Sequence, residues 1–199
     1  MDFLLYGFGP YKQFRSNITS KIVRKVPRSA NLKTIVFPVR FNKTQFTAAI
    51  RKNNPDIILG LGQCSTGTKL RIERRAVNRR RNNKEDKGRA IVRGGAKFLP
   101  TTLKLRSLGR GAQPSLSAGD YVCNYSMYVM LDYIKRRGKK VRYGFIHIPH
   151  NYPRVRAEQL IRLAARRLAP ARPPARARRV ISPIESAARS RPRSRPTRR

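Results

Sequence analysis

Four short apolar runs, spaced along the chain with helix-like segments between them, constrain its fold most. They are residues 2–6 (DFLLY), 32–40 (LKTIVFPVR), 55–62 (PDIILGLG) and 141–149 (VRYGFIHIP). Their length and their aliphatic, β-branched and aromatic content are typical of buried strands. Strands that alternate with helices form a largely parallel sheet covered on both faces. We therefore predict an α/β fold, a single three-layer α/β/α domain with a mostly parallel mixed sheet.

The segments between these runs predict the helices and the remaining strands. Asn42 is a predicted N-cap, with Gln45 three residues later as a variant of the capping box, and Gly138 ends a helix. Residues 79–97 are polar, basic and rich in glycine, which favours a loop. Helices are expected at 17–25, 42–54, 101–108, about 121–137 and 156–169, and further strands at 68–77 and 113–117.

Positive charge is the main anomaly of composition. The chain of 199 residues has 47 Lys and Arg against 9 Asp and Glu, a formal net charge of +38. Ten of the Arg lie in residues 170–199, which contain six Pro, one Glu and no aromatic residue. Such a segment buries too little surface to offset its ordering entropy, so we predict a folded domain at 1–169 and a disordered basic tail at 170–199.

Charge and cysteine content also bear on partners and compartment. The electric field of a chain with a net charge of +38 attracts polyanions, which predicts at least non-specific nucleic-acid binding. No apolar run is long enough to span a bilayer and no signal-peptide pattern is present, so we expect a cytoplasmic protein. No Cys/His cluster has zinc spacing, so we expect no metal site.

Cys123, in the stretch SAGDYVCNYSMYVML, is the first candidate for chemistry. With Asp120 as N-cap, Cys123 falls in the first turn of a helix, where unpaired N–H groups and the helix dipole lower a thiol pKa. The same N–H groups could bind an oxyanion. The competing interpretation is a small buried hydrophobic residue.

Two further residues could complete a catalytic set with Cys123. His147 lies near the C-terminal end of the predicted strand at 141–149, at the edge where α/β sheets bind ligands, and could serve as a base. The alternative is a histidine with a purely structural role. Glu73 is the acid in LRIERRAVN and could orient that histidine, or form salt bridges with Arg74 and Arg75. Spacing alone leaves these alternatives open.

Several stretches together resemble the pyroglutamyl-peptidase I family of cytoplasmic cysteine peptidases, which remove N-terminal pyroglutamate. They are GFGPY, PDIILGLGQ, LRIERRAVN, SAGDYVCNYSMY and GFIHIP, in the family's order and covering the chain to about residue 169. The most specific is AGxYxCN, followed 24 residues after its cysteine by the histidine of FIHIP. The resemblance implies a Cys123, His147 and Glu73 triad, a thioester acyl-enzyme, no cofactor and a possible homo-oligomer.

The resemblance also implies a set of substrate-binding residues. Phe8 and Tyr11 match aromatics that grip the pyroglutamyl ring, with Tyr11 standing where the family usually has Phe. Gln63 matches the glutamine after the third strand, and Asn17 the asparagine after the first loop. His150, just past the family's histidine position, is a weaker alternative base.

Other positions depart from the family. After ERRAVN the family has an acidic loop whose arginine positions substrate or stabilises the oxyanion, whereas this chain has RRRNNKEDKG. Arg81 is close to that position and Asn83 falls on it without a gap, so the role is left unassigned. Cys64 is expected to be a free thiol, with a disulfide to Cys123 as the lesser alternative. We favour an active pyroglutamyl peptidase; the alternative is a catalytically impaired, peptidase-like nucleic-acid-binding protein.

Overall fold

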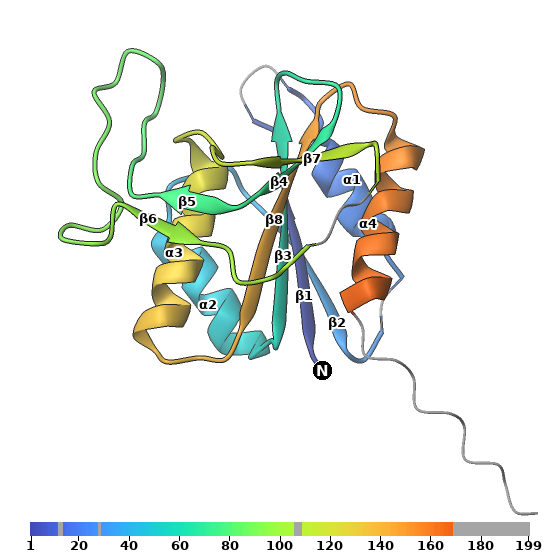
Figure 1. The fold of residues 1–199 in the computed structure, drawn as a ribbon, viewed down its shortest axis with the longest axis horizontal. Helices are drawn as coiled ribbons and strands as arrows, with labels where there is room; N and C mark the ends of the chain where they lie inside the picture. The colour runs from blue at the N-terminus through green and yellow to red at the C-terminus, as the bar shows by residue number, and fades with distance from the viewer. Residues whose placement is uncertain (12–13, 28, 106–108, 169–199) are drawn as a thin grey trace, which may run out of the picture.

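The computed structural model describes residues 1–11, 14–27, 29–105 and 109–168, and the predicted tail at 170–199 lies outside them. Their centre is a six-stranded sheet covered on both faces (Figure 1). The helices α2 (Lys43–Asn53) and α3 (Val122–Arg136) pack on one face, and α1 (Ile18–Lys25) and α4 (Arg154–Leu168) on the other. The predicted three-layer α/β/α architecture is confirmed.

The strands of the sheet are β1 (Phe3–Phe8), β2 (Leu32–Phe37), β3 (Ile57–Cys64), β4 (Leu70–Glu73), β7 (Ala112–Ser115) and β8 (Arg142–Pro149). Their order across the sheet is β2-β1-β3-β8-β4-β7. Parallel pairing joins β2 with β1, β1 with β3, and β3 with β8. Beyond β8 the direction reverses, because β4 pairs antiparallel with β8 and parallel with β7. The sheet is thus mixed and mostly parallel, as predicted.

Three predictions about local structure are wrong. The strand expected at 68–77 breaks at Arg74, because β5 (Arg75–Val77) leaves the main sheet and pairs with β6 (Phe98–Pro100) beside α3. The helix expected at 101–108 is not formed over 101–105, where the backbone N–H groups of Thr102 and Leu103 donate to the Tyr143 carbonyl instead. The strand expected at 32–40 ends at Phe37, since Pro38 has no N–H to donate.

Helix ends follow the sequence more closely. The Asn42 side chain accepts from the Gln45 N–H, so the predicted cap is present. Gln45 does not complete the capping box: its amide donates to the Arg40 carbonyl, to which the Asn42 N–H also donates. Helix α3 ends just before Gly138, whose φ of +57° suits a residue without Cβ.

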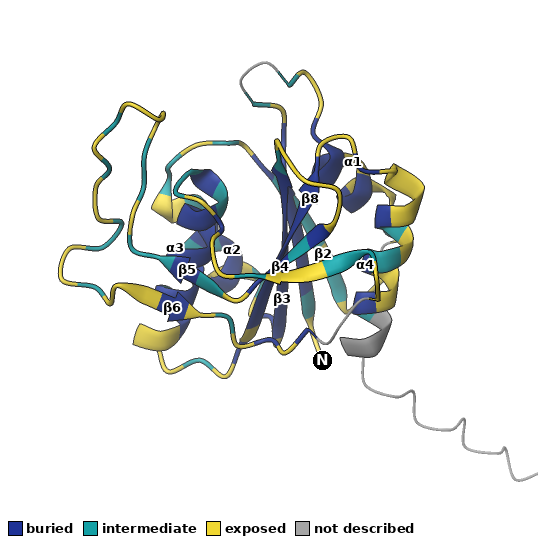
Figure 2. Cartoon of the chain, turned by 45° about the horizontal axis from the view of Figure 1, so that its top comes forward, coloured by how far each residue is buried: buried dark blue, intermediate teal, exposed yellow. Residues whose placement is uncertain are grey.

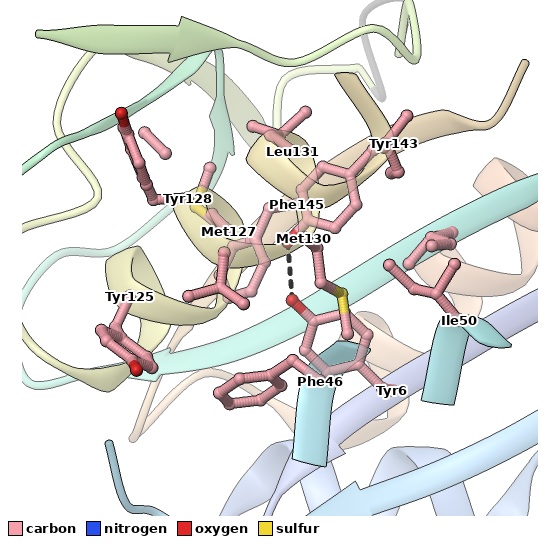
Figure 3. Packing of buried hydrophobic residues seen from close by; sticks show 14 of the residues in the cluster. Tyr6, Phe46, Ile50, Tyr125, Met127, Tyr128, Met130, Leu131, Tyr143 and Phe145 are labelled. Carbon is pink, nitrogen blue, oxygen red and sulfur yellow. Dashed lines mark hydrogen bonds between the residues drawn. The ribbon is translucent and has the colours of Figure 1, made fainter. Parts of the chain in front are cut away.

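A buried network of hydroxyl groups fixes the start of α3 to the sheet, and Figure 3 shows its bond between Tyr6 and Tyr143. The Tyr6 hydroxyl on β1 lies 2.6 Å from the Tyr143 hydroxyl on β8 and 3.0 Å from Ser126 Oγ on α3. Ser126 Oγ in turn donates to the Cys123 carbonyl over 2.8 Å. Burial raises the pKa of both tyrosines, so they stay protonated hydrogen-bond partners. Figure 2 shows the central strands as the most deeply buried part of the chain.

Candidate active site

A cavity of about 420 Å³ opens where the carboxyl ends of β1, β3 and β8 meet the first turn of α3. This edge of an α/β sheet is where ligands usually bind. The cavity therefore gathers residues that lie far apart in the sequence. Of the seven predicted catalytic and substrate-binding residues, all but Glu73 line it: Phe8, Tyr11, Asn17, Gln63, Cys123 and His147.

Glu73 and His147 form a buried pair behind the cavity. The Glu73 Oε1 atom lies 2.8 Å from His147 Nδ1, and the exposed fractions of the two residues are 1% and 5%. Glu73 is thus paired with His147 rather than with Arg74 or Arg75. The contact arises from register, because Glu73 on β4 lies beside Phe145 on β8, two residues from His147. The carboxylate fixes the imidazole with Nδ1 as donor and leaves Nε2 free to exchange a proton.

Cys123 and His147 approach each other over Gly62. Gly62 on β3 pairs directly with His147 on β8. A methyl group built on Gly62 would lie 2.8 Å from Cys123 Sγ and 2.8 Å from His147 Nε2. The sulfur and the ring nitrogen are therefore separated by at most twice that distance, across a space that only glycine leaves open. Within the described part of the chain no hydrogen bond joins these two atoms, a common state of such pairs before substrate binds.

The start of α3 is built differently from the prediction. Its N-cap is Tyr121, with no side-chain cap, rather than Asp120. Asp120 turns instead to the basic loop: its carboxylate accepts from Arg81 Nε and lies 3.8 Å from Arg79 Nε, and its carbonyl accepts from the Arg81 N–H. Cys123 still falls in the first turn, whose backbone N–H groups have no intrahelical partners, and Val122 and Cys123 of that turn line the cavity.

The ionisation of Cys123 also differs from the prediction. Cys123 is half-buried and borders the cavity, yet the protein encloses its sulfur enough for burial to raise the thiol pKa to about 12. The nearby Cys64 and Glu73 act in the same direction. Burial is the largest cause of this shift, which is opposite in direction to the shift expected from the helix dipole. The resting cysteine is a neutral thiol at pH 7, and its proton must pass to a base when it reacts.

One wall of the cavity is apolar and aromatic. Phe8 is 2% exposed, whereas Tyr11 and Tyr121 are half-buried with ring centroids 6.5 Å apart. Val39 adds an aliphatic contact on the same cavity. Such a wall suits a small, flat, neutral group better than a charged one.

Gln63 supplies a polar group to this cavity. Its Oε1 accepts from the Ile18 N–H over 2.9 Å and so holds the start of α1. Its Nε2 is buried and has no hydrogen-bond partner of good geometry within the described residues, although the Tyr11 hydroxyl lies beside it. An unpartnered amide donor in a residue only 6% exposed is costly unless a ligand accepts from it.

Asn17 uses its polar atoms within the protein. Its Oδ1 accepts from the Thr19 N–H and hydroxyl, and its Nδ2 donates to the Gly9 carbonyl. These bonds join the start of α1 to the loop after β1. Asn17 therefore shapes the cavity wall, whereas Gln63 also offers a free donor.

Comparison with known proteins identifies the family. The family model for pyroglutamyl peptidase matches residues 1–162. The chain belongs to the pyroglutamyl peptidase family. A pyrrolidone-carboxylate peptidase of Saccharolobus solfataricus is 31% identical over 170 residues, which are 75% of this chain and 79% of that protein. One from Thermosipho melanesiensis is 29% identical over 173 residues, 78% of this chain and 86% of that protein.

Solved structures give the same result. Pyroglutamyl peptidase I from Bacillus amyloliquefaciens superposes with a TM-score of 0.76 at 26% identity, over 82% of this chain and 94% of that chain. The pyrrolidone carboxyl peptidase from Thermococcus litoralis, at 24% identity, shares the fold with a TM-score of 0.75 over 83% of this chain and 91% of that chain. The resemblance drawn from sequence motifs is therefore confirmed at the level of family and fold.

The residues that depart from family expectations are placed as follows. Arg81 lines the cavity but is engaged by Asp120, and Asn83 is exposed, with its side chain accepting from the Asp86 N–H. His150 lies outside this cavity, exposed and against Phe14 at a centroid distance of 5.4 Å. Cys64 borders the cavity as a free thiol, so no disulfide joins it to Cys123.

Sequence reasoning missed three residues at the site. Gly62 separates the cysteine from the histidine, Tyr121 extends the aromatic wall, and Arg71 lines the cavity next to His147. The period of two residues along a strand carried the signal for Arg71, which must share a face with Glu73. Among the residues that the structure describes, no group of three His, Cys, Asp or Glu is placed to hold a metal ion. No helix of that part is long and apolar enough to cross a membrane.

Proposed function

We propose that this chain is a cysteine peptidase that hydrolyses the bond after an N-terminal pyroglutamyl residue through a Cys123, His147 and Glu73 triad. The convergence of Cys123 Sγ and His147 Nε2 over Gly62, with Glu73 on the other ring nitrogen, is the observation that carries the proposal. Membership in the pyroglutamyl peptidase family supplies the reaction class.

Acylation follows from the positions of the three residues. The Cys123 thiol passes its proton to His147 Nε2 as its sulfur bonds to the pyroglutamyl carbonyl carbon. Because burial raises the pKa of the resting thiol, a base such as His147 is needed to take its proton when the sulfur attacks. Glu73 stabilises the imidazolium that forms. The carbonyl oxygen becomes an oxyanion that the backbone N–H groups of the first turn of α3 can bind.

Release of the amine ends acylation, and deacylation by water then completes the cycle. His147 donates its proton to the leaving amine as the C–N bond breaks, which leaves a thioester on Cys123. His147 then takes a proton from a water molecule that attacks the thioester carbon. Collapse of the second tetrahedral intermediate expels the Cys123 sulfur, which regains the proton from His147, and free pyroglutamate departs.

Recognition of the lactam ring matches the chemistry of the cavity. The ring is flat and uncharged, and Phe8, Tyr11 and Tyr121 provide flat apolar surface. The free Nε2 donor of Gln63 can pair with the lactam carbonyl, an acceptor that proline lacks. A site built around a buried donor discriminates strongly against an analogue without the acceptor.

A substrate panel tests this proposal. The coumarin amides of pyroglutamate, proline and glutamine are offered to the purified protein in reducing buffer. We expect release from the pyroglutamyl amide alone, at least about 10³-fold faster than from the prolyl amide. Equal rates on the pyroglutamyl and prolyl amides would refute the proposed recognition of the lactam.

The alternative from the sequence, a peptidase-like protein that acts by binding nucleic acid, has a distinct signature. A folded protein without activity on any of the amides, yet with affinity for DNA that falls steeply with salt, would favour it. Homo-oligomer formation and a cytoplasmic location stay predictions of the sequence and of the resemblance.

A further inference from the structure

We propose that Arg71 is a specificity-determining residue that binds a carboxylate on the leaving side of the substrate. This inference rests on the proposed function and goes beyond it by naming a substrate class. Peptides with Asp or Glu directly after pyroglutamate are the preferred substrates.

The register of the sheet places Arg71 next to the proposed base. Arg71 on β4 pairs directly with His147 on β8 in the antiparallel ladder. Directly opposed residues point to the same face of a sheet, with Cβ atoms about 5 Å apart. Arg71 accordingly lines the same cavity as His147 and Cys123.

The guanidinium of Arg71 is held in place but not neutralised. Its Nη2 donates to the Thr66 carbonyl over 2.7 Å and to the Thr66 hydroxyl over 3.1 Å. No ion pair within the described residues includes Arg71, and its Nη1 and Nε make no hydrogen bond there. A guanidinium that is fixed at one nitrogen, and whose other two nitrogens are free to donate, is suited to bind a carboxylate.

The acids near the cavity are already engaged. Asp120 is the carboxylate among the described residues that line it, and Arg81 binds that group. Glu73 lies behind the cavity and is paired with His147. Neither acid competes for Arg71, so an acidic side chain of the substrate would meet a cation without a partner.

The chemistry of the cleavage step determines which part of the substrate meets Arg71. His147 Nε2 must come within hydrogen-bond reach of the leaving nitrogen to protonate it. The proposed function seats the pyroglutamyl ring against the aromatic residues Phe8, Tyr11 and Tyr121 of the same cavity. The residue that follows pyroglutamate therefore extends along the remaining wall, which includes Cys64, Thr66 and Arg71.

The test compares two isosteric substrates in three proteins. Pyroglutamyl-aspartyl and pyroglutamyl-asparaginyl peptides, both amidated at the C-terminus, are hydrolysed by wild type, Arg71→Gln and Arg142→Gln. Glutamine keeps an N–H donor for Thr66 and removes the charge. Arg142 is the matched control, because it starts β8 and lies five residues, about 16 Å, from His147. The readout is the ratio of kcat/KM for the two peptides, which cancels any loss of folded protein.

We expect wild type to favour the aspartyl peptide about three- to tenfold at low salt, the effect of one partly exposed charge-assisted contact. The ratio should fall to about one in Arg71→Gln and stay at the wild-type value in Arg142→Gln. A ratio near one in wild type, or an equal fall in both variants, would overturn the assignment of Arg71. Failure to hydrolyse even the asparaginyl peptide would overturn the proposed function itself, and this inference with it.

Discussion

Gly62→Ala is the substitution that best probes the geometry of the site. The added methyl group would lie 2.7 Å from His147 Cδ2, 2.8 Å from His147 Nε2 and 2.8 Å from Cys123 Sγ. Ordinary contacts of a Cβ begin at 3.4 Å, so the histidine and the cysteine must each retreat by roughly 0.6 Å. Both belong to rigid elements, β8 and the first turn of α3, and neither can move without disturbing its own packing.

The consequence for catalysis follows from the sensitivity of proton transfer to distance. A displacement of about 1 Å of a reacting group can cost about 10²-fold in rate. We therefore expect Gly62→Ala to lower kcat on a pyroglutamyl amide by about 10²-fold or more. Overpacking of this kind costs about 1–3 kcal/mol of stability, so the variant should unfold at a lower temperature but remain folded at 25 °C.

Two other glycines provide the controls. In Gly9→Ala the methyl group would meet, among the described residues, only the Phe37 carbonyl oxygen, at 3.7 Å, and activity should be retained. In Gly60→Ala it would meet the rings of Phe145 and Tyr6, so the loss should appear in stability. Steady-state kinetics and thermal unfolding of the three variants separate these effects. If Gly62→Ala retained more than a third of the wild-type kcat, Cys123 and His147 would not act on each other across this space.

Three further predictions concern the residues around the nucleophile. Because burial raises the pKa of the Cys123 thiol to about 12, its alkylation by iodoacetamide should accelerate continuously from pH 6 to pH 9; a plateau above pH 6 would indicate a preformed thiolate. Glu73→Gln should lower kcat about 10²- to 10⁴-fold with little change in KM, since the imidazolium loses its counter-charge, and a KM effect alone would contradict the triad. Asn124→Asp should lower the free energy of unfolding, measured in urea, by about 2–4 kcal/mol. The reason is that the Asn124 amide donates to the carbonyls of Val77 and Arg79, and a carboxylate there would repel both. Unchanged stability would refute this role.

The layers of the fold and most of its central strands could be predicted from local sequence. The apolar runs at 2–6, 55–62 and 141–149 are too hydrophobic to lie anywhere but in the core, and the observed β1, β3 and β8 correspond to them. The break at Arg74 was not foreseeable in this way. It depends on pairing between β5 and β6, a non-local contact that a polarity pattern over 68–77 does not encode.

The site shows the same division between local and non-local information. The predicted strand end and helix start singled out His147 and Cys123, and the family resemblance added Phe8 and Gln63; the structure has all four on one cavity. The pKa of Cys123 depends on how much protein surrounds the sulfur, which no motif reports. The partner of Asp120 depended on the path of the basic loop, which brings Arg81 to it and leaves the start of α3 uncapped.

The central claim is that Cys123 is the nucleophile of a pyroglutamyl peptidase, and one comparison tests it most directly. Wild type, Cys123→Ala and Cys64→Ala are assayed side by side on the pyroglutamyl coumarin amide in reducing buffer, with folding of each protein verified by circular dichroism. Cys64→Ala is the matched control, because it removes the other thiol that borders the cavity. We expect release by wild type and Cys64→Ala and none by Cys123→Ala. Release by Cys123→Ala, or no release by folded wild type, would contradict the account.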